Sequence, residues 1–172
     1  MLPIIPGLML VASPLLGDSN FARTVVFVLE HNEHGTLGLI VNRPLDISLG
    51  DLWSACPSAL RALHRCADGG PVERDKGLIL HGIQDLPGSL PLCAGLAVGG
   101  DAAQANPDDP LAPRLFLGHS GWSPGQLEAE ITSGSWLLRP GHRRFVLDPE
   151  AGEDLWDELA RTEDPAPPPG NN

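Results

Sequence analysis

Glycine and proline interrupt this chain so often that no helix or strand can run far. The sequence holds 20 glycines and 18 prolines among its 172 residues. Proline cannot donate to a β-ladder and breaks helices, and glycine favours turns. The combined fraction is still lower than in disordered low-complexity chains. The chain is therefore expected to fold into short elements joined by many turns.

Two apolar runs predict an antiparallel β-hairpin. Residues Thr24–Leu29 (TVVFVL) are mostly β-branched or aromatic, and Thr36–Val41 (TLGLIV) form a second strand. The polar turn Glu30–Gly35 joins them, and so short a loop places the two strands side by side. Both runs are almost entirely apolar, which predicts that both faces of the hairpin are covered. Pro44 ends the second strand.

Other short elements follow in irregular order. Further strands are expected at Leu8–Ala12, Gly77–His81, Leu96–Val98, Arg114–Leu117, Ser135–Leu138 and Arg144–Leu147. Helices are expected to start at Ser48, Ser58, Ser123 and Asp148, with Pro124 at the first position of the third and Leu155, Trp156 and Leu159 buried in the fourth. Gly118–Trp122 is expected to be a turn. Hairpins outnumber β-α-β units, which favours the α+β class, with a mixed, largely antiparallel sheet and about four flanking helices.

A chain of this length has room for one domain and a tail. A single domain is expected over residues 1–161. The last stretch, 162–172 (TEDPAPPPGNN), contains four prolines, and Ala166 is its only apolar residue. It cannot bury enough surface to offset its ordering entropy, so a disordered, acidic and proline-rich tail is expected there.

The chain is acidic, with a formal net charge of −11. Such a chain repels phosphate backbones unless its few bases cluster. The only basic cluster is Arg139 with His142, Arg143 and Arg144, and the acidic stretch 148–172 is expected to pair with it. The helix expected after Ser123 carries no base, and no helix-turn-helix with a basic face is visible. No direct binding to nucleic acid is expected.

Cysteine usage and the N-terminal stretch bear on the compartment. The three cysteines, Cys56, Cys66 and Cys93, contain no CxxC pair, and their number is odd. Reduced cysteines in a cytoplasmic protein are the simplest interpretation. The apolar stretch 1–17 has no basic segment and no cleavage site, and it carries three prolines. Neither a signal peptide nor a membrane span is expected from it.

Two local patterns suggest catalytic or metal chemistry. Gly118–Trp122 (GHSGW) approximates the nucleophile elbow G-x-S-x-G, but a tryptophan stands where the last glycine belongs, and the order Ser…acid…His is not met. His31-Asn32-Glu33-His34, with Glu30, gathers imidazoles and carboxylates at a hairpin tip, where His81 or His119 would have to complete a metal site. No catalytic residue, metal ligand or cofactor is assigned from these patterns.

Four stretches together carry a family resemblance. They are Asp18–Pro44, Gly69–Val72 (GGPV), Gly77–His81 (GLILH) and Leu117–Trp136 (LGHSGWSPGQLEAEITSGSW). Because these stretches occur in this order and at this spacing, the chain resembles the YqgE/AlgH family of bacterial proteins. The resemblance implies a complex α+β fold, with a bent sheet folded into a pseudo-barrel, and no established enzymatic activity. His119-Ser120 stands where the family usually has Tyr-Ala.

Some residues that match the family pattern are candidates for ligand binding. They are Arg23, His31, Asn42, Arg43, Trp122 and Gln126. Arg43 and Trp122 stand at the ends of elements, where side chains are presented for recognition, and they are expected to share one partly exposed patch.

These observations favour a non-enzymatic binding or regulatory module that acts on an unknown protein or small-molecule partner. One alternative is a transcriptional regulator, which is the label that the family carries. The other alternative is a hydrolase or metalloenzyme that the sequence motifs do not identify.

Overall fold

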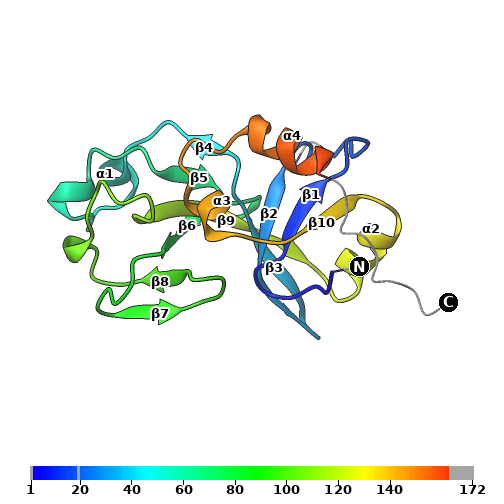
Figure 1. The fold of residues 1–172 in the computed structure, drawn as a ribbon, viewed down its shortest axis with the longest axis horizontal. Helices are drawn as coiled ribbons and strands as arrows, with labels where there is room; N and C mark the ends of the chain where they lie inside the picture. Colours follow the sequence, from blue (N-terminus) through cyan, green and yellow to red (C-terminus); the bar gives the residue numbers. More distant parts are fainter. Residues whose placement is uncertain (1, 19, 163–172) are drawn as a thin grey trace.

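The computed structural model describes residues 2–18 and 20–162 (Figure 1). All of the expected tail except Thr162 lies outside the described residues. Within them, ten strands form one sheet. The strands are β1 (Met9–Ala12), β2 (Val25–Asn32), β3 (Gly35–Ile40), β4 (Pro44–Leu45), β5 (Cys66–Asp68), β6 (Val72–His81), β7 (Ser89–Pro91), β8 (Ala97–Gly99), β9 (Arg114–Trp122) and β10 (Trp136–Arg139).

The sheet is mixed and largely antiparallel. Its main path runs β10-β1-β2-β3-β9-β6-β8-β7, and β4 and β5 branch from it. Among the described strands β5 and β9 make the only parallel pair. The sheet is open, because its two end strands, β10 and β7, are not hydrogen-bonded to each other. With its helices, this sheet confirms the predicted α+β class.

The predicted hairpin is confirmed as β2 and β3. The two strands pair antiparallel from Val26 opposite Ile40 to Asn32 opposite Gly35, with a bulge between Val28 and Glu30. Alternate residues of a strand point to opposite faces. Accordingly, Val25, Phe27 and Leu29 lie in one apolar cluster, and Val26 and Val28 lie in another. Both faces of the hairpin are therefore buried, as its apolar sequence predicts.

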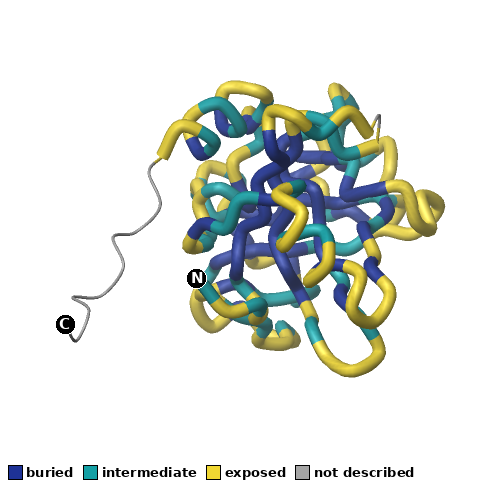
Figure 2. Tube along the Cα trace, turned by 90° about the vertical axis from the view of Figure 1, so that its right-hand side faces the viewer, coloured by how far each residue is buried: buried dark blue, intermediate teal, exposed yellow. Residues whose placement is uncertain are grey.

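The helices are short. The described residues contain α1 (Leu49–Leu52), α2 (Gln126–Thr132), α3 (Arg143–Leu147) and α4 (Glu153–Arg161), and two 3₁₀ turns at Ser58–Leu60 and Ala102–Gln104. Helix α4 packs against β1 (Figure 1). It buries Leu155 and Leu159 as predicted, while Trp156 is half-buried. Figure 2 shows the buried strands at the centre of the molecule, beneath exposed turns and loops. No helix in the described ranges is long and apolar enough to cross a membrane.

Five predictions of local structure are wrong. The last helix, expected to start at Asp148, begins at Glu153, because Asp148 ends α3 in an extended conformation. The helix expected from Ser58 is a single 3₁₀ turn. Residues Gly118–Trp122 continue strand β9 instead of turning, because His119 pairs with β6 and Ser120–Trp122 pair with β3. Helix α2 begins at Gln126, after Gly125 has adopted a φ of +80°, so Pro124 is not its first residue. The strand expected at Arg144–Leu147 is helix α3, whose first turn is capped by His142, which accepts from the Arg144 N–H at Nδ1 (3.1 Å).

Candidate functional site

The family-like glycine motif lies at the centre of the sheet, where β9 changes its neighbour. The first half of β9 pairs with β5, and its second half pairs with β3 on the same side. Gly69 fills the junction between them. Its N–H donates to the carbonyl of Leu117 (2.7 Å), and its own carbonyl accepts from the N–H of Ile40 (2.9 Å). Three segments far apart in sequence therefore meet at Gly69.

A glycine is also required at position 70, where the backbone comes close to strand β9. The φ of Gly70 is +147°, and a Cβ there would lie 2.3 Å from the carbonyl oxygen of His119. Arg74 closes the junction on the outside, because it donates to the Gly70 carbonyl (3.2 Å) and lies 3.4 Å from a carboxylate oxygen of Asp68. The motif GGPV thus serves the close approach of two backbone segments.

The Ser120 side chain has a structural contact at this junction. It is fully buried within β9, and its hydroxyl donates to the Gly69 carbonyl (3.2 Å). A nucleophile elbow needs an exposed serine on a strand-to-helix turn. The strand conformation and the burial of Ser120 both argue against that motif.

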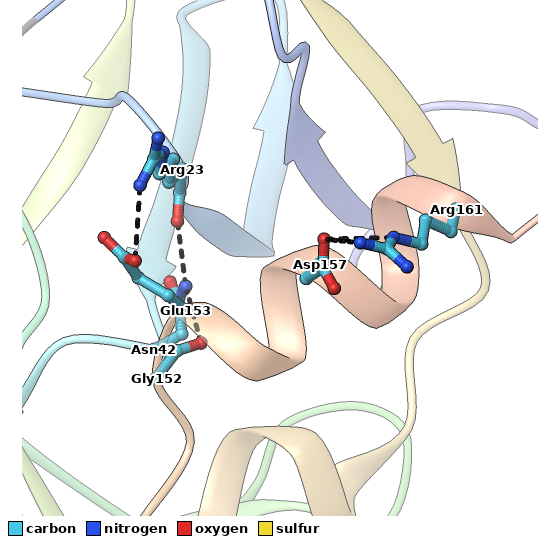
Figure 3. Close-up of polar contacts among 6 residues, drawn as sticks. All are labelled: Arg23, Asn42, Gly152, Glu153, Asp157 and Arg161. Carbon is cyan, nitrogen blue, oxygen red and sulfur yellow. Dashed lines mark hydrogen bonds and ion pairs between the residues drawn. The ribbon is translucent and has the colours of Figure 1, made fainter.

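Asn42 and Arg23, two of the predicted ligand-binding residues, are brought together (Figure 3). The Asn42 side chain accepts from the N–H of Val25 (2.8 Å) and donates to the carbonyls of Arg23 (3.0 Å) and Gly152 (3.2 Å). The Arg23 guanidinium is exposed and lies 3.4 Å from a carboxylate oxygen of Glu153. Asn42 therefore ties the start of β2 to the start of α4.

Trp122 and Gln126 form a second group, around Glu130. The indole N–H groups of Trp122 (3.2 Å) and Trp136 (3.0 Å) both donate to Oε1 of Glu130, and the Gln126 amide donates to Oε2 (2.9 Å). Phe21 stacks on Trp122 with ring centroids 5.9 Å apart. Trp122 is only 5% exposed, so the structure places it in the core and not in a partly exposed patch.

The two remaining candidates, His31 and Arg43, make other contacts. His31 hydrogen-bonds to the hydroxyl of Thr36 through Nδ1 (2.6 Å), and Thr36 is the cross-strand neighbour of Trp122. Arg43 is half-buried, and its carbonyl accepts from the N–H of Asp68 (2.9 Å). Among the described residues no recorded side-chain contact joins Arg43 to Trp122. Sequence reasoning missed Glu130, although its spacing of four residues from Gln126 on one helix suggests a side-chain pair.

An open groove of about 560 Å³, here called the hairpin groove, lies beside the tip of the β2–β3 hairpin. Its apolar part comes from Leu37, Val72, Trp122 and Pro124, of which Val72 is 39% exposed. Glu30 and Asn32, which hydrogen-bond to each other (3.0 Å), supply polar groups together with His34. At Gly121 an added Cβ would meet no atom within 4 Å, so this glycine keeps the groove open.

The hairpin tip does not assemble a metal site in the structure. In the part of the chain that the structure describes, no group of three or more His, Cys, Asp or Glu side chains is placed to hold a metal ion. His34 and Glu33 are 3.6 Å apart and largely exposed, whereas His31 is held by Thr36. The geometry of the hairpin tip is that of a polar surface turn.

Comparisons with known proteins identify the family of the chain. A family model described as AlgH-like matches residues 9–166. The chain belongs to this AlgH-like family. A UPF0301 protein of Myxococcus xanthus is 41% identical over 169 residues, which cover 91% of this chain and 88% of that protein. A UPF0301 protein of Pseudomonas aeruginosa is 35% identical, with 88% and 85% covered.

Solved structures of the AlgH-like fold resemble this one over most of the chain. The solution structure of AlgH from Pseudomonas aeruginosa has a TM-score of 0.69 and 31% identity, and covers 94% of this chain and 92% of that one. A crystal structure of the protein DIP2367 from Corynebacterium diphtheriae has a TM-score of 0.72 and 28% identity, with 96% and 90% covered. The AlgH-like family is one of uncharacterised function.

Proposed function

We propose that this AlgH-like protein is a non-enzymatic binding module whose hairpin groove holds a basic, extended segment of a partner protein. The observation that carries the proposal is the groove itself, where exposed apolar surface at Val72 lies close to the polar tip of a hairpin. Small-molecule sites bury most of their ligand in a concave cavity. An open groove suits a length of polypeptide better.

The charge of the groove supports a basic partner. Glu30 lines it, Glu33 lies at the same hairpin tip, and none of the residues that line the groove is Lys or Arg. The whole chain has a net charge of −11, which attracts cationic partners over long range. A segment that alternates basic and apolar residues would satisfy both the apolar surface and the carboxylates.

The charge distribution also separates this proposal from direct regulation of transcription. Arg139, in the basic cluster, donates to the backbone carbonyls of Leu159 (2.9 Å) and Thr162 (2.6 Å), and Arg144 lies over the ring of Phe145. These arginines contact protein groups. We expect no sequence-dependent, sub-micromolar binding to duplex DNA at physiological salt, which an electrophoretic mobility shift experiment measures.

A cytoplasmic location is part of the proposal. Cys56 and Cys66 are buried and unpaired, and Cys93 is half-buried and unpaired. Burial raises the pKa of the Cys66 thiol to about 11, so this group is protonated and unreactive at neutral pH. Unpaired thiols of this kind fit a reducing compartment.

Peptide titration followed by amide NMR tests the groove. A short peptide that alternates lysine and leucine is expected to shift the amide signals of Leu37, Val72 and Gly121, and the matching glutamate–leucine peptide is not. Gly121→Val, which places a side chain in open space, is expected to weaken binding about tenfold or more without unfolding the protein. The control Glu128→Gln removes an exposed carboxylate that does not line the groove. Equal binding by the Gly121→Val variant, or by the acidic peptide, would contradict the proposal.

A further inference from the structure

A second cavity, of about 510 Å³, lies between α3, α4 and the loop at residues 110–111, away from the hairpin groove. We call it the arginine pocket. Arg65 and Arg144 line it, and so do three carboxylates, those of Asp148, Asp154 and Glu158. Its apolar lining includes Leu111, Phe145 and Leu155. The pocket therefore combines both signs of charge with apolar surface.

Arg65 brings a buried positive charge to this pocket. The residue is 8% exposed. Its Nε donates to the Pro113 carbonyl (3.0 Å), and its Nη2 donates to the carbonyls of Ala112 (2.8 Å) and Leu147 (2.9 Å). These bonds fix the plane of the guanidinium. Its Nη1 donates to no group of the described residues, which leaves it available to a ligand.

A second buried arginine lies close to the first. Arg114 is fully buried, and its Nη1 donates to the carbonyls of Val41 (2.9 Å) and Val146 (2.8 Å). Its Nε and Nη2 are buried and have no hydrogen-bond partner among the residues that the structure describes. Arg114 and Arg65 thus hold the successive carbonyls of Val146 and Leu147 at the end of α3. Burial, and to a smaller extent the charge of Arg65, lower the pKa of Arg114 to about 10.

No carboxylate of the described residues is in direct contact with these two buried cations. The charges of Asp148 and Asp109 act on Arg65 from farther away, and that of Asp148 also on Arg114, where they partly oppose the lowering of the arginine pKa by burial. Within residues 2–18 and 20–162 no carboxylate oxygen lies within 4.0 Å of a guanidinium nitrogen of Arg65 or Arg114. Buried charges in proteins are normally paired, because an unpaired one loses its hydration without compensation. The carboxylates of Asp148, Asp154 and Glu158 are instead exposed around the pocket. An anionic group of a ligand would supply the direct contact that these carboxylates do not make.

We propose that the arginine pocket binds a small zwitterion with an apolar body, namely an apolar amino acid or a short apolar peptide. Its carboxylate pairs with Nη1 of Arg65. Its ammonium group lies among the exposed carboxylates, Glu158 in particular. Its apolar part packs against Phe145 and Leu155. The proposal is independent of the hairpin groove, because no residue lines both cavities.

Ligand analogues test each charge separately. Leucine, phenylalanine and leucyl-leucine are titrated into the full-length protein, with binding followed by calorimetry and by amide NMR signals of Ala112 and Leu147. At least one of the three is expected to bind and to shift those signals. The N-acetylated form of that ligand lacks the ammonium group, and its amide form lacks the carboxylate. Each is therefore expected to have an affinity at least about tenfold lower than that of the zwitterion.

A matched pair of variants tests the pocket itself. Glu158→Gln removes an exposed pocket carboxylate and is expected to weaken binding of the zwitterion while leaving the N-acetylated form unaffected. Glu150→Gln removes an exposed carboxylate that does not line the pocket and is expected to change neither. The proposal is overturned if none of the three ligands binds, if the N-acetylated form or the amide form binds as tightly as the zwitterion, or if Glu158→Gln has no effect. The Gly121→Val variant, which alters only the hairpin groove, is expected to bind the zwitterion as the wild type does. The two proposals can therefore fail independently of each other.

Discussion

The amide of Asn42 donates to the carbonyl of Gly152 at 3.2 Å, across 110 positions of sequence. Figure 3 shows this contact beside the Arg23–Glu153 ion pair, at the start of helix α4. Because the same side chain also bonds to the backbone at Val25 and Arg23, it holds three segments in one geometry. The side chain contributes to the fold through these backbone bonds.

Asn42→Ala is therefore expected to lower the free energy of unfolding by about 2–4 kcal/mol. The substitution removes three hydrogen bonds and leaves the buried N–H of Val25 without a partner, which costs more than a lost bond at the surface. Chemical denaturation measures the change. The control Asn20→Ala alters an exposed asparagine and should stay within about 0.5 kcal/mol of the wild type. A value of that small size for Asn42→Ala would show that α4 docks without this bond.

Gly70 and Gly121 offer a matched pair of glycine substitutions. Gly70→Ala places a Cβ 2.3 Å from the His119 carbonyl oxygen and forces a non-glycine residue to a φ of +147°. We expect a loss of about 3 kcal/mol or more, or failure to fold. Gly121→Ala meets no atom within 4 Å and should change stability by less than about 1 kcal/mol. Similar melting temperatures for the two variants would contradict the close approach at Gly70.

Glu130 is expected to organise the aromatic cluster through its carboxylate. Glu130→Leu removes the acceptor of two indole N–H groups and should lower stability by about 2–4 kcal/mol, since both partners are largely buried. Tryptophan fluorescence should change as well, because Trp122 and Trp136 lose a charged neighbour. Glu128→Leu on the exposed face of the same helix is the control, and neither property should change there. If the two variants behave alike, the hydrogen bonds of the carboxylate contribute little.

Local patterns predict this fold where neighbouring residues decide the structure. The β2–β3 hairpin and the buried residues of α4 follow from apolar runs, a short polar turn and helical spacing. Pairings between distant segments leave no such pattern. That β9 exchanges β5 for β3 as its neighbour depends on the backbone approach at Gly69, which single-residue preferences do not encode.

Buried charge is the other feature that sequence reasoning misses. Arginine is almost always exposed, so nothing in the sequence predicts that Arg65 and Arg114 lie in the interior. Their hydrogen bonds to Val146 and Leu147 help to explain why the apolar run Phe145–Leu147 is helical instead of extended. For the site, the resemblance singled out Asn42 and Trp122, but their partners Gly152 and Glu130 become visible only in three dimensions.

His81 makes the stability of the protein depend on pH. The ring is fully buried, accepts from the N–H of Ile83 at Nδ1 (3.0 Å), and contacts the Ser89 hydroxyl at Nε2 (2.8 Å). Since Nδ1 is an acceptor, the ring is neutral and carries its proton on Nε2. Burial lowers the pKa of His81 below its ordinary 6.5, and a hydrogen bond with the Gly99 backbone only partly opposes this effect.

The sign of the effect follows from the lowered pKa. Well above pH 6.5 the ring is neutral in both states, so its titration does not affect stability. As the pH falls below 6.5, His81 becomes protonated in the unfolded chain but stays neutral in the folded protein. The free energy of unfolding therefore decreases by at most about 1.4 kcal/mol per pH unit. The decrease ends once the pH passes below the lowered pKa of the folded protein.

Denaturation of the wild type and His81→Asn between pH 5 and 7.5 tests this account. We expect His81→Asn to be less stable at pH 7.5, because it loses the contact with Ser89, but to lose less of its stability on acidification than the wild type. Asn is chosen because its carbonyl oxygen can replace Nδ1 as the acceptor for Ile83. His34→Gln is the control, since that side chain is largely exposed, and it should keep the slope of the wild type. If the free energy of unfolding of His81→Asn changes with pH as steeply as that of the wild type, groups other than His81 cause the pH dependence, because the substitution removes the buried ring.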